Sequence, residues 1–181
     1  KVICVDNNKE KIDRLNNGEV PIYEPELEDL LVKNIKEKRI EFTTDIEYAV
    51  KNSEVLFIAV GTPTADDGSA DLKYVLEVAN SIGEFMNNYK VIVDKSTVPV
   101  GTGKLVRETI EKKLKDRNSN LNFDIVSNPE FLREGRAVND CLRPDRVIIG
   151  SESEKATKIM KKVYSVLYIN EVPFVFTNVE T

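Results

Sequence analysis

Histidine is absent from the 181 residues of this sequence. Every catalytic triad that uses histidine, every histidine metal site and every proton transfer by imidazole is therefore excluded within the chain. Cysteine is scarce: the two thiols are Cys4, in an apolar segment, and Cys141, in a polar loop. Two cysteines are too few for a cysteine-rich zinc site, and nothing in their spacing indicates a secreted disulfide framework.

Long hydrophobic runs are also missing. The longest, Val55 to Val60, is far shorter than the ~20 residues that a membrane-spanning helix needs. The net charge is −5 and no block of lysine and arginine stands out, so the sequence has no electrostatic signature of nucleic-acid binding. We therefore expect a soluble, cytoplasmic protein with neither nucleic acid nor membrane as a partner.

Strand and helix patterns alternate along the whole chain. Short apolar segments without alternation predict strands buried on both faces. Between them, apolar residues recur at helical spacing, most clearly from Leu72 to Met86. The predicted strands are 2–5, 40–43, 54–60, 90–94, 123–126, 146–149 and 174–176. The predicted helices are 9–16, 26–38, 45–50, 72–86 and 102–115, and one that a Ser151–Glu154 capping box opens, with Ala156, Ile159, Met160, Val163 and Leu167 on its inner face.

This alternation predicts an α/β fold, a doubly wound, Rossmann-like parallel sheet with helices on both faces. The length suits one domain with a real core. Because a strand pattern begins at the first residues, we expect the first strand of the fold to be missing. Ligands of this fold bind at the carboxyl ends of the strands. The segments that follow the strands are therefore the candidate sites.

Asp6 follows the first predicted strand. An acidic side chain at this point in a dinucleotide fold accepts hydrogen bonds from the ribose hydroxyls of NAD and repels the 2′-phosphate of NADP. Asp is equally common as a helix cap, and the residue types leave both interpretations open. The glycine-rich loop that should precede this strand is absent from the sequence.

The segment after Val60 is Gly61-Thr-Pro-Thr64, whose threonine hydroxyls could reach phosphate or ribose oxygens. Asp66, Asp67 and Asp71 follow, but they lack the alternating ligands and distal glutamate of a calcium loop. We therefore predict turn and cap roles for these aspartates, and no metal site.

Two further segments carry candidate groups. Lys95 to Gly103 leads into a helix, where main-chain N–H groups suit an anionic ligand, although a capped loop without a ligand fits as well. In Ser127 to Gly135, Glu130 and Glu134 would share a face if this were a helical turn. With Arg133 between them they could polarise a water or hold a substrate, or they could belong to a solvated surface turn.

Together these segments resemble the UDP-glucose/GDP-mannose dehydrogenase family, and the resemblance covers essentially the whole chain. The matching motifs, in the family's order, are Val5-Asp6 with Lys11, Val60-Gly-Thr-Pro-Thr64 with Asp67-Gly-Ser-Ala-Asp71, Lys95-Ser-Thr-Val-Pro-Val-Gly-Thr102, Asn128-Pro-Glu-Phe-Leu-Arg-Glu-Gly135 and Arg143-Pro-Asp-Arg-Val-Ile-Ile-Gly150. The Ser-Thr-Val-Pro and Pro-Glu-Phe-Leu-Arg-Glu segments are specific, whereas many Rossmann proteins have an acidic residue after a strand.

In that family an NAD-binding domain and a UDP-sugar-binding domain flank a long central helix. The enzymes oxidise the sugar 6-hydroxyl twice, reduce two NAD and pass through a thioester on a cysteine. The resemblance implies that residues 1–181 are a partial NAD-binding domain, with the central helix and the UDP-binding domain absent. It also implies NAD-dependent oxidation of UDP-glucose to UDP-glucuronate, by a full-length protein that is a homo-oligomer.

The resemblance assigns roles residue by residue. Asp6 and Lys11 would hold the adenosine ribose and its surroundings. Thr62 and Thr97 would line the dinucleotide, with Thr97 also near the reacting carbon. The residues that would border the substrate are Glu130, Phe131, Leu132, Arg133 and Glu134. Among these, Glu130 would act as acid or base through a water, and Glu134 would lie close to the nicotinamide.

The sequence departs from the family in what it lacks. It has neither the Gly-x-Gly-x-x-Gly loop nor, beyond Thr181, the substrate-binding lysine and asparagine and the nucleophile segment. Cys141 does not match that segment, so we interpret it as a structural thiol and expect that this chain alone does not complete the reaction. Three alternatives stay open: a dehydrogenase of UDP-N-acetylmannosamine or another UDP-hexose, a non-catalytic nucleotide-binding remnant, and a methyltransferase, in which the Thr97 and Glu130 segments would have no role.

Overall fold

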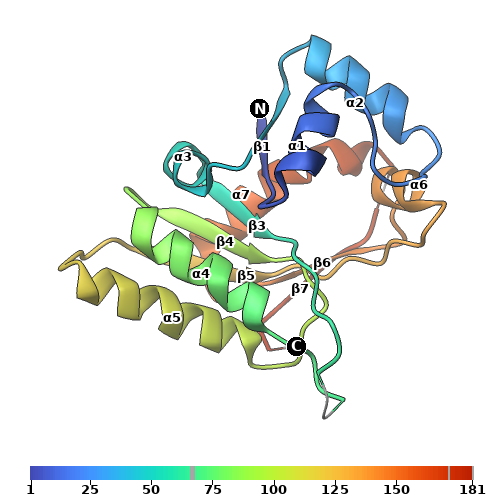
Figure 1. The fold of residues 1–181 in the computed structure, drawn as a ribbon. Coiled ribbons are helices and arrows are strands. Elements are labelled where there is room, and N and C mark those ends of the chain that lie inside the picture. The colour runs from blue at the N-terminus through green and yellow to red at the C-terminus, as the bar shows by residue number, and fades with distance from the viewer. Residues whose placement is uncertain (66–67, 171, 181) are drawn as a thin grey trace. The chain divides into compact units, whose positions relative to one another are not determined.

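The computed structural model describes residues 1–65, 68–170 and 172–180, and Figure 1 shows its ribbon. The chain forms two compact units. The first contains Lys1–Ser53 and Phe131–Pro144, and the second contains Glu54–Glu130 and Asp145–Thr181. Each unit has a sheet of its own. The first unit is therefore assembled from two segments that are far apart in the sequence.

A two-stranded parallel sheet is the framework of the first unit. Strand β1 pairs with β2 along its whole length, beginning with Val2 opposite Ile40. Asn8 caps α1 and Asp45 caps α3, because each side chain accepts a hydrogen bond from a main-chain N–H in the first turn of its helix. The elements are β1 (Val2–Val5), α1 (Lys9–Asn16), α2 (Leu27–Lys36), β2 (Ile40–Thr43), α3 (Ile46–Asn52) and α6 (Ala137–Leu142).

A five-stranded sheet in the order β3-β4-β5-β6-β7 is the framework of the second unit. Helices α4 and α5 lie side by side on one face of this sheet, and α7 lies on the other (Figure 1). On the α7 face, Val91, Val93 and Val126 form one buried cluster with Ala156 and Met160. The elements are β3 (Val55–Ile58), α4 (Lys73–Phe85), β4 (Lys90–Asp94), α5 (Thr102–Asp116), β5 (Phe123–Ser127), β6 (Val147–Gly150), α7 (Glu154–Val163), the 3-10 helix η1 (Ser165–Asn170) and β7 (Phe174–Thr177).

The predicted α/β class is confirmed, and every predicted strand is present. One neighbouring pair departs from the parallel arrangement, because β5 and β6 are antiparallel, with Ser127 opposite Gly150. The chain between these strands leaves the second unit to form Phe131–Pro144 of the first. The described helix between them, α6, belongs to the first unit, so β5 and β6 are not joined by the helical crossover within one unit that makes consecutive strands parallel.

The start and the inner face of the last helix also differ from the prediction. Ser153 caps α7, and its Oγ accepts the N–H of Ala156 at 3.2 Å. The predicted cap, Ser151, instead accepts the N–H of Ser153 at 3.1 Å. Val163 was expected inside but is 42% exposed. The reason is that α7 ends at Val163, and the following 3-10 helix brings Leu167 into the core in its place.

Helices α4 and α5 approach each other closely at Gly83. A Cβ atom at this position would lie 2.7 Å from the Cβ of Lys113 and 3.1 Å from the carbonyl oxygen of Ile110. Arg117, just after α5, donates to the carbonyl of Glu84 at 2.7 Å, near the end of α4. A glycine at this contact lets the two helices pack without a gap.

Asp94 at the end of β4 is a buried carboxylate, only 5% exposed. Neither of its oxygen atoms has a hydrogen-bond partner among the described residues. Burial raises the pKa of Asp94 to about 6. The nearby N–H of Ser96 opposes this shift only in part, because it donates to the carbonyl of Ile58 at 3.2 Å. An ionised Asp94 therefore lowers the free energy of unfolding of the second unit.

Replacing Gly83 with alanine tests the α4–α5 contact by the sign of its effect. Alanine in a helix interior normally stabilises by ~0.5–1 kcal/mol relative to glycine. Here the clash with α5 should reverse the sign and lower the free energy of unfolding by ~1–3 kcal/mol. Gly61→Ala is the matched control, because a Cβ there meets no atom within 4 Å. A more stable Gly83→Ala variant in urea unfolding would show that the contact is not tight.

The pKa of Asp94 makes a prediction about stability and pH. Its folded value, about 6, lies above its ordinary value of 3.8. The contribution of this group is therefore fully present below the unfolded pKa and is lost as the pH rises through about 6. The gap between the two values corresponds to ~3 kcal/mol. Asp94→Asn should remove this dependence, so its unfolding free energy should rise relative to that of the wild type between about pH 4 and about pH 6, and the difference should stay constant above about pH 7.

The control for this comparison is Asp116→Asn, which removes an exposed carboxylate at the end of α5. Wild-type and Asp94→Asn curves of unfolding free energy against pH that run parallel would contradict the assignment.

Candidate functional site

Asp6 immediately follows β1, at the carboxyl end of the strand. Its Oδ1 accepts the N–H of Asn8 at 2.9 Å, and its Oδ2 accepts the ammonium group of Lys11 at 2.5 Å. The cap of α1 is Asn8, whose side chain accepts the N–H of Lys11 at 3.0 Å. The interpretation of Asp6 as a helix cap is therefore wrong.

The charge of Asp6 is stabilised within this pair. Burial raises the pKa of Asp6, but hydrogen bonds from Lys11 and Asn8 lower it by more, so the pKa lies below its ordinary value. The side chain of Asp6 keeps 28% of its surface exposed and that of Lys11 keeps 45%. An ionised carboxylate has about four acceptor positions, so Asp6 can accept further hydroxyl groups from a ligand.

Thr62 and Thr97 lie together at the carboxyl edge of the sheet in the second unit. The Thr62 hydroxyl donates to the carbonyl of Thr97 at 2.9 Å. The Ser96 hydroxyl donates to the carbonyl of Val60 at 2.8 Å. The loops after β3 and β4 are thus tied to each other, as expected for neighbouring parallel strands. The Thr97 side chain is exposed and that of Thr62 is half-buried.

Helix α5 begins directly after this loop. Its N-cap is Gly101, which has φ +91° and offers no side chain to cap the helix. The Thr102 hydroxyl donates to the carbonyl of Pro99 at 2.8 Å, and the N-cap makes no side-chain hydrogen bond to the first turn of the helix. The alternative, a loop in which a side chain caps the helix, is therefore not what the structure has. An anionic ligand at the start of this helix stays a prediction.

Asn128 anchors the segment that leaves β5 towards Glu130. Its side chain is buried, its amide donates to the carbonyl of Ile148 at 2.7 Å, and its Oδ1 accepts the hydroxyl of Tyr164. Its main-chain N–H donates to the carbonyl of Asp94 at 2.9 Å. Glu130, two residues later, is half-buried. The start of this segment is therefore fixed by the second unit.

The rest of the segment, from Phe131 to Glu134, belongs to the first unit and is exposed. Arg133 donates to both carboxylate oxygens of Asp140 in α6, from Nε at 2.9 Å and from Nη2 at 2.7 Å. This bidentate pair lowers the pKa of Asp140 to about 2. The segment is not helical, so the condition under which Glu130 and Glu134 would share a helical face is not met.

Several absences complete the description. The described residues contain no group of three or more His, Cys, Asp or Glu side chains that could hold a metal ion. Asp71 accepts the N–H of Lys73 at 2.9 Å, as its predicted turn role requires, whereas Asp66 and Asp67 lie outside the described residues. Within the described part of the chain no helix is long and apolar enough to cross a membrane.

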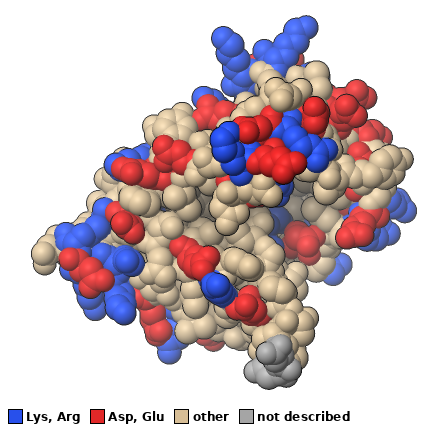
Figure 2. Space-filling view, in the orientation of Figure 1, with Lys and Arg blue, Asp and Glu red and all other residues tan. Residues whose placement is uncertain are grey.

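The two cysteines are both free. Cys141 lies in α6 and is exposed, so the prediction of a polar loop at this position was wrong and the thiol does not belong to the core. Figure 2 shows acidic and basic side chains interspersed over the face in view, in keeping with the lack of a basic block in the sequence.

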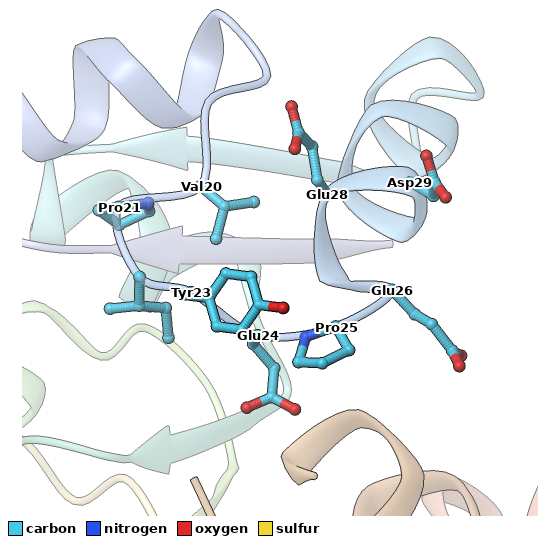
Figure 3. Close-up of a pocket in the computed structure, with 9 residues that line it drawn as sticks. Val20, Pro21, Tyr23, Glu24, Pro25, Glu26, Glu28 and Asp29 are labelled. Carbon is cyan, nitrogen blue, oxygen red and sulfur yellow. The ribbon is translucent and has the colours of Figure 1, made fainter. Parts of the chain in front are cut away.

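A hollow of about 500 Å³ lies in the first unit, and Figure 3 shows its lining. A single stretch of chain, residues 20–29, forms it, and none of the predicted site residues lines it. Among the lining residues Glu24 has distant partners: its carboxylate accepts the N–H of Gly135 at 2.9 Å and that of Val138 at 3.4 Å.

Sequence reasoning missed Glu24 and Asp140, the two carboxylates that hold the segment around Glu134. The partners Glu24 and Gly135 are 111 positions apart, so no local pattern links them. Two prolines, Pro21 and Pro25, flank Glu24 closely. They are the one signal that could have marked this stretch as a stiff loop with a role.

Residues 1–168 match the UDP-glucose/GDP-mannose dehydrogenase family, NAD binding domain. The chain is 50% identical over 181 residues to the UDP-glucose 6-dehydrogenase TuaD of Bacillus subtilis, covering 100% of this chain and 38% of that protein. It is 46% identical over 165 residues to a UDP-glucose 6-dehydrogenase of Pseudomonas aeruginosa, covering 91% of this chain and 36% of that protein.

Solved structures of dehydrogenases from this family superpose closely on the chain. A UDP-glucose dehydrogenase from Pyrobaculum islandicum superposes with a TM-score of 0.92 at 37% identity, over 99% of this chain and 41% of that one. A GDP-mannose dehydrogenase from Pseudomonas aeruginosa superposes with a TM-score of 0.91 at 35% identity, again over 99% and 41%. The chain thus spans about two fifths of the length of such relatives. It belongs to the UDP-glucose/GDP-mannose dehydrogenase family and matches the NAD binding domain of that family.

Proposed function

We propose that this chain is the NAD-binding part of a UDP-glucose 6-dehydrogenase, an enzyme that oxidises UDP-glucose to UDP-glucuronate. The observation that carries the proposal is the ionised, partly exposed carboxylate of Asp6 at the end of β1, with acceptor positions to spare. The relatives named UDP-glucose 6-dehydrogenase support the choice of reaction.

The polar groups at the strand ends suit a dinucleotide. Asp6 would accept hydrogen bonds from both hydroxyls of the adenosine ribose, with Lys11 beside it. Thr62 and Thr97 would contact the dinucleotide from the second unit, and their hydroxyl oxygens can accept as well as donate hydrogen bonds. NAD would supply the acceptor of the hydride that each oxidation removes from the sugar.

The segment that begins at Asn128 would border the substrate. Glu130 would accept a proton from the water that hydrolyses the thioester, which the resemblance puts on a cysteine outside these residues. Glu134 would lie beside the nicotinamide, and Phe131 and Leu132 would line the sugar. Arg133 would act through its pair with Asp140, which fixes the main chain between the two glutamates.

We further propose that residues 1–181 are a partial domain within a longer enzyme, one that contains a central helix and a UDP-binding domain. The share of the relatives that the chain covers, 38% of TuaD, supports this. The proposed enzyme is a cytoplasmic homo-oligomer, in line with the resemblance.

A second candidate is the oxidation of another nucleotide sugar. The TM-score is 0.91 to the GDP-mannose dehydrogenase and 0.87, at 27% identity, to a UDP-D-ManNAc dehydrogenase from Pyrococcus horikoshii. The domain is thus shared by enzymes with different sugars. Assays of the complete gene product with UDP-glucose, UDP-N-acetylmannosamine and GDP-mannose, followed by NADH absorbance, would separate these candidates.

Asp6 should determine the preference for NAD over NADP. In the complete gene product, Asp6→Asn should weaken NAD binding by ~1.5–3 kcal/mol, because a charge-assisted pair of hydrogen bonds is lost. The same change should narrow the preference against NADP, because the charge that repels the 2′-phosphate is gone. Asp13→Asn, which removes an exposed carboxylate that pairs with Lys9 in α1, is the matched control. Calorimetric titrations in which Asp6→Asn binds both cofactors as the wild type does would rule out the ribose role.

Glu130 should be needed for hydrolysis and not for cofactor binding. In the complete gene product, Glu130→Gln should bind NAD normally and turn over ~10²–10⁴-fold more slowly, because the water loses its base. Sugar should accumulate covalently on the enzyme, which mass spectrometry of the intact protein would detect. Glu134→Gln should affect hydrolysis less and positioning more. Wild-type turnover by Glu130→Gln would leave this residue with a structural role only.

A further inference from the structure

Glu134 sits in a tight turn. The N–H of Arg136 donates to the carbonyl of Arg133 at 3.0 Å, which closes the turn around Glu134 and Gly135. Gly135 has φ +77°, a conformation that glycine adopts without strain and that other residues avoid. A Cβ at Gly135 would meet no atom within 4 Å, so the backbone conformation alone requires glycine there.

Two carboxylates hold this turn from outside it. On one side of Glu134, Asp140 Oδ2 accepts the main-chain N–H of Arg133 at 3.1 Å, in addition to the guanidinium contacts. On the other side, Glu24 accepts the N–H of Gly135 at 2.9 Å, and its second oxygen reaches the N–H of Val138 at 3.4 Å. The main-chain donors on both sides of Glu134 thus point to a carboxylate, and all of these residues belong to the first unit.

The backbone around Glu24 is restricted, which fixes the position of its carboxylate. Pro25 restricts the backbone of Glu24 to extended conformations. The carbonyl of Glu24 accepts the N–H of Leu27 at 3.2 Å, at the start of α2. Figure 3 shows Glu24 and Glu28 pointing to opposite sides of this stretch of chain, so the two carboxylates are not interchangeable. Glu28 is exposed, whereas Glu24 is half-buried.

We propose that Glu24 is a positioning residue for Glu134: by accepting the N–H groups of Gly135 and Val138, it fixes the turn from which the Glu134 side chain extends. The inference rests on the proposed function, in which Glu134 lies beside the nicotinamide. The competing view is that Glu24 merely stabilises the start of α6. The two views differ in whether the effect of Glu24 passes through Glu134.

The contact itself is tested by hydrogen exchange. In the complete gene product, Glu24→Gln removes the charge and one of the two acceptor oxygens, so it should accelerate exchange in peptides that cover 131–140 by ~10- to 100-fold, the range for a lost hydrogen bond to a charged group. Glu28→Gln is the matched control, because it removes the same charge from the same stretch and lies on the other side of it. Unchanged exchange in Glu24→Gln would overturn the proposal at its first step.

A double-mutant cycle then separates positioning from structure. Glu24→Gln should lower kcat by ~10-fold in the wild-type background, because a small displacement of a catalytic group is costly. In the Glu134→Gln background the same change should lower kcat by less than about twofold, because there is no longer a carboxylate to position. Asp140→Asn should behave in the same way, as it releases the other side of the turn.

Equal losses in both backgrounds would overturn the positioning role and leave Glu24 as a structural contact. Full activity in Glu134→Gln would overturn the role of Glu134 and this inference together. A wild-type protein that neither binds NAD nor oxidises any nucleotide sugar would contradict the proposed function, and the exchange of the 131–140 peptides would still report whether Glu24 holds the turn.

Discussion

One main-chain hydrogen bond recurs just past the ends of β1, β4 and β5, three of the strands that candidate side chains follow. The N–H of Asp6 donates to the carbonyl of Thr43 at 3.3 Å, beyond the last paired residue of β1. The N–H of Lys95 donates to the carbonyl of Ile58 at 2.9 Å, and that of Asn128 to the carbonyl of Asp94 at 2.9 Å. These bonds extend the parallel register by one step, because a buried carbonyl needs a donor. The segments of Asp6, Thr97 and Glu130 therefore start from positions that the sheet fixes, and the chemistry at the edge depends on that start.

Three aspartates show how the surroundings of a carboxylate decide its use. Asp6 is held by one ammonium group and one N–H and stays partly exposed, so it is charged and still able to accept a ligand. Asp140 accepts hydrogen bonds from the guanidinium of Arg133 on both oxygens, so its role is to hold the main chain in place. Asp94 is buried without a hydrogen-bond partner among the described residues, and burial raises its pKa. The residue type is the same in all three, and the supply of donors differs.

Local patterns in the sequence predicted the parts of the fold that local physics controls. The apolar stretch of β4 and the helical face of α4 follow from burial and periodicity, and Thr62 and Thr97 meet because neighbouring parallel strands end at one edge. The misses involve partners that are distant in the sequence or choices between near-equal neighbours. Ser151 and Ser153 are the same residue type and both come before α7, but only Ser153 is directly adjacent to its first residue. Helix α6 has only six residues, too few for a periodic apolar face to be recognised, and Glu24 depends on a residue 111 positions away.

The discontinuous first unit has a consequence for the order in which the protein can fold during synthesis. Residues 1–53 leave the ribosome long before 131–144, which complete the same unit. Contacts of such sequence separation form late, because the intervening loop must close first. While the second unit emerges, the carboxylate of Glu24 faces water, and the turn that will carry Glu134 has not been made. The order of translation thus makes this turn one of the last parts of the first unit to acquire its shape.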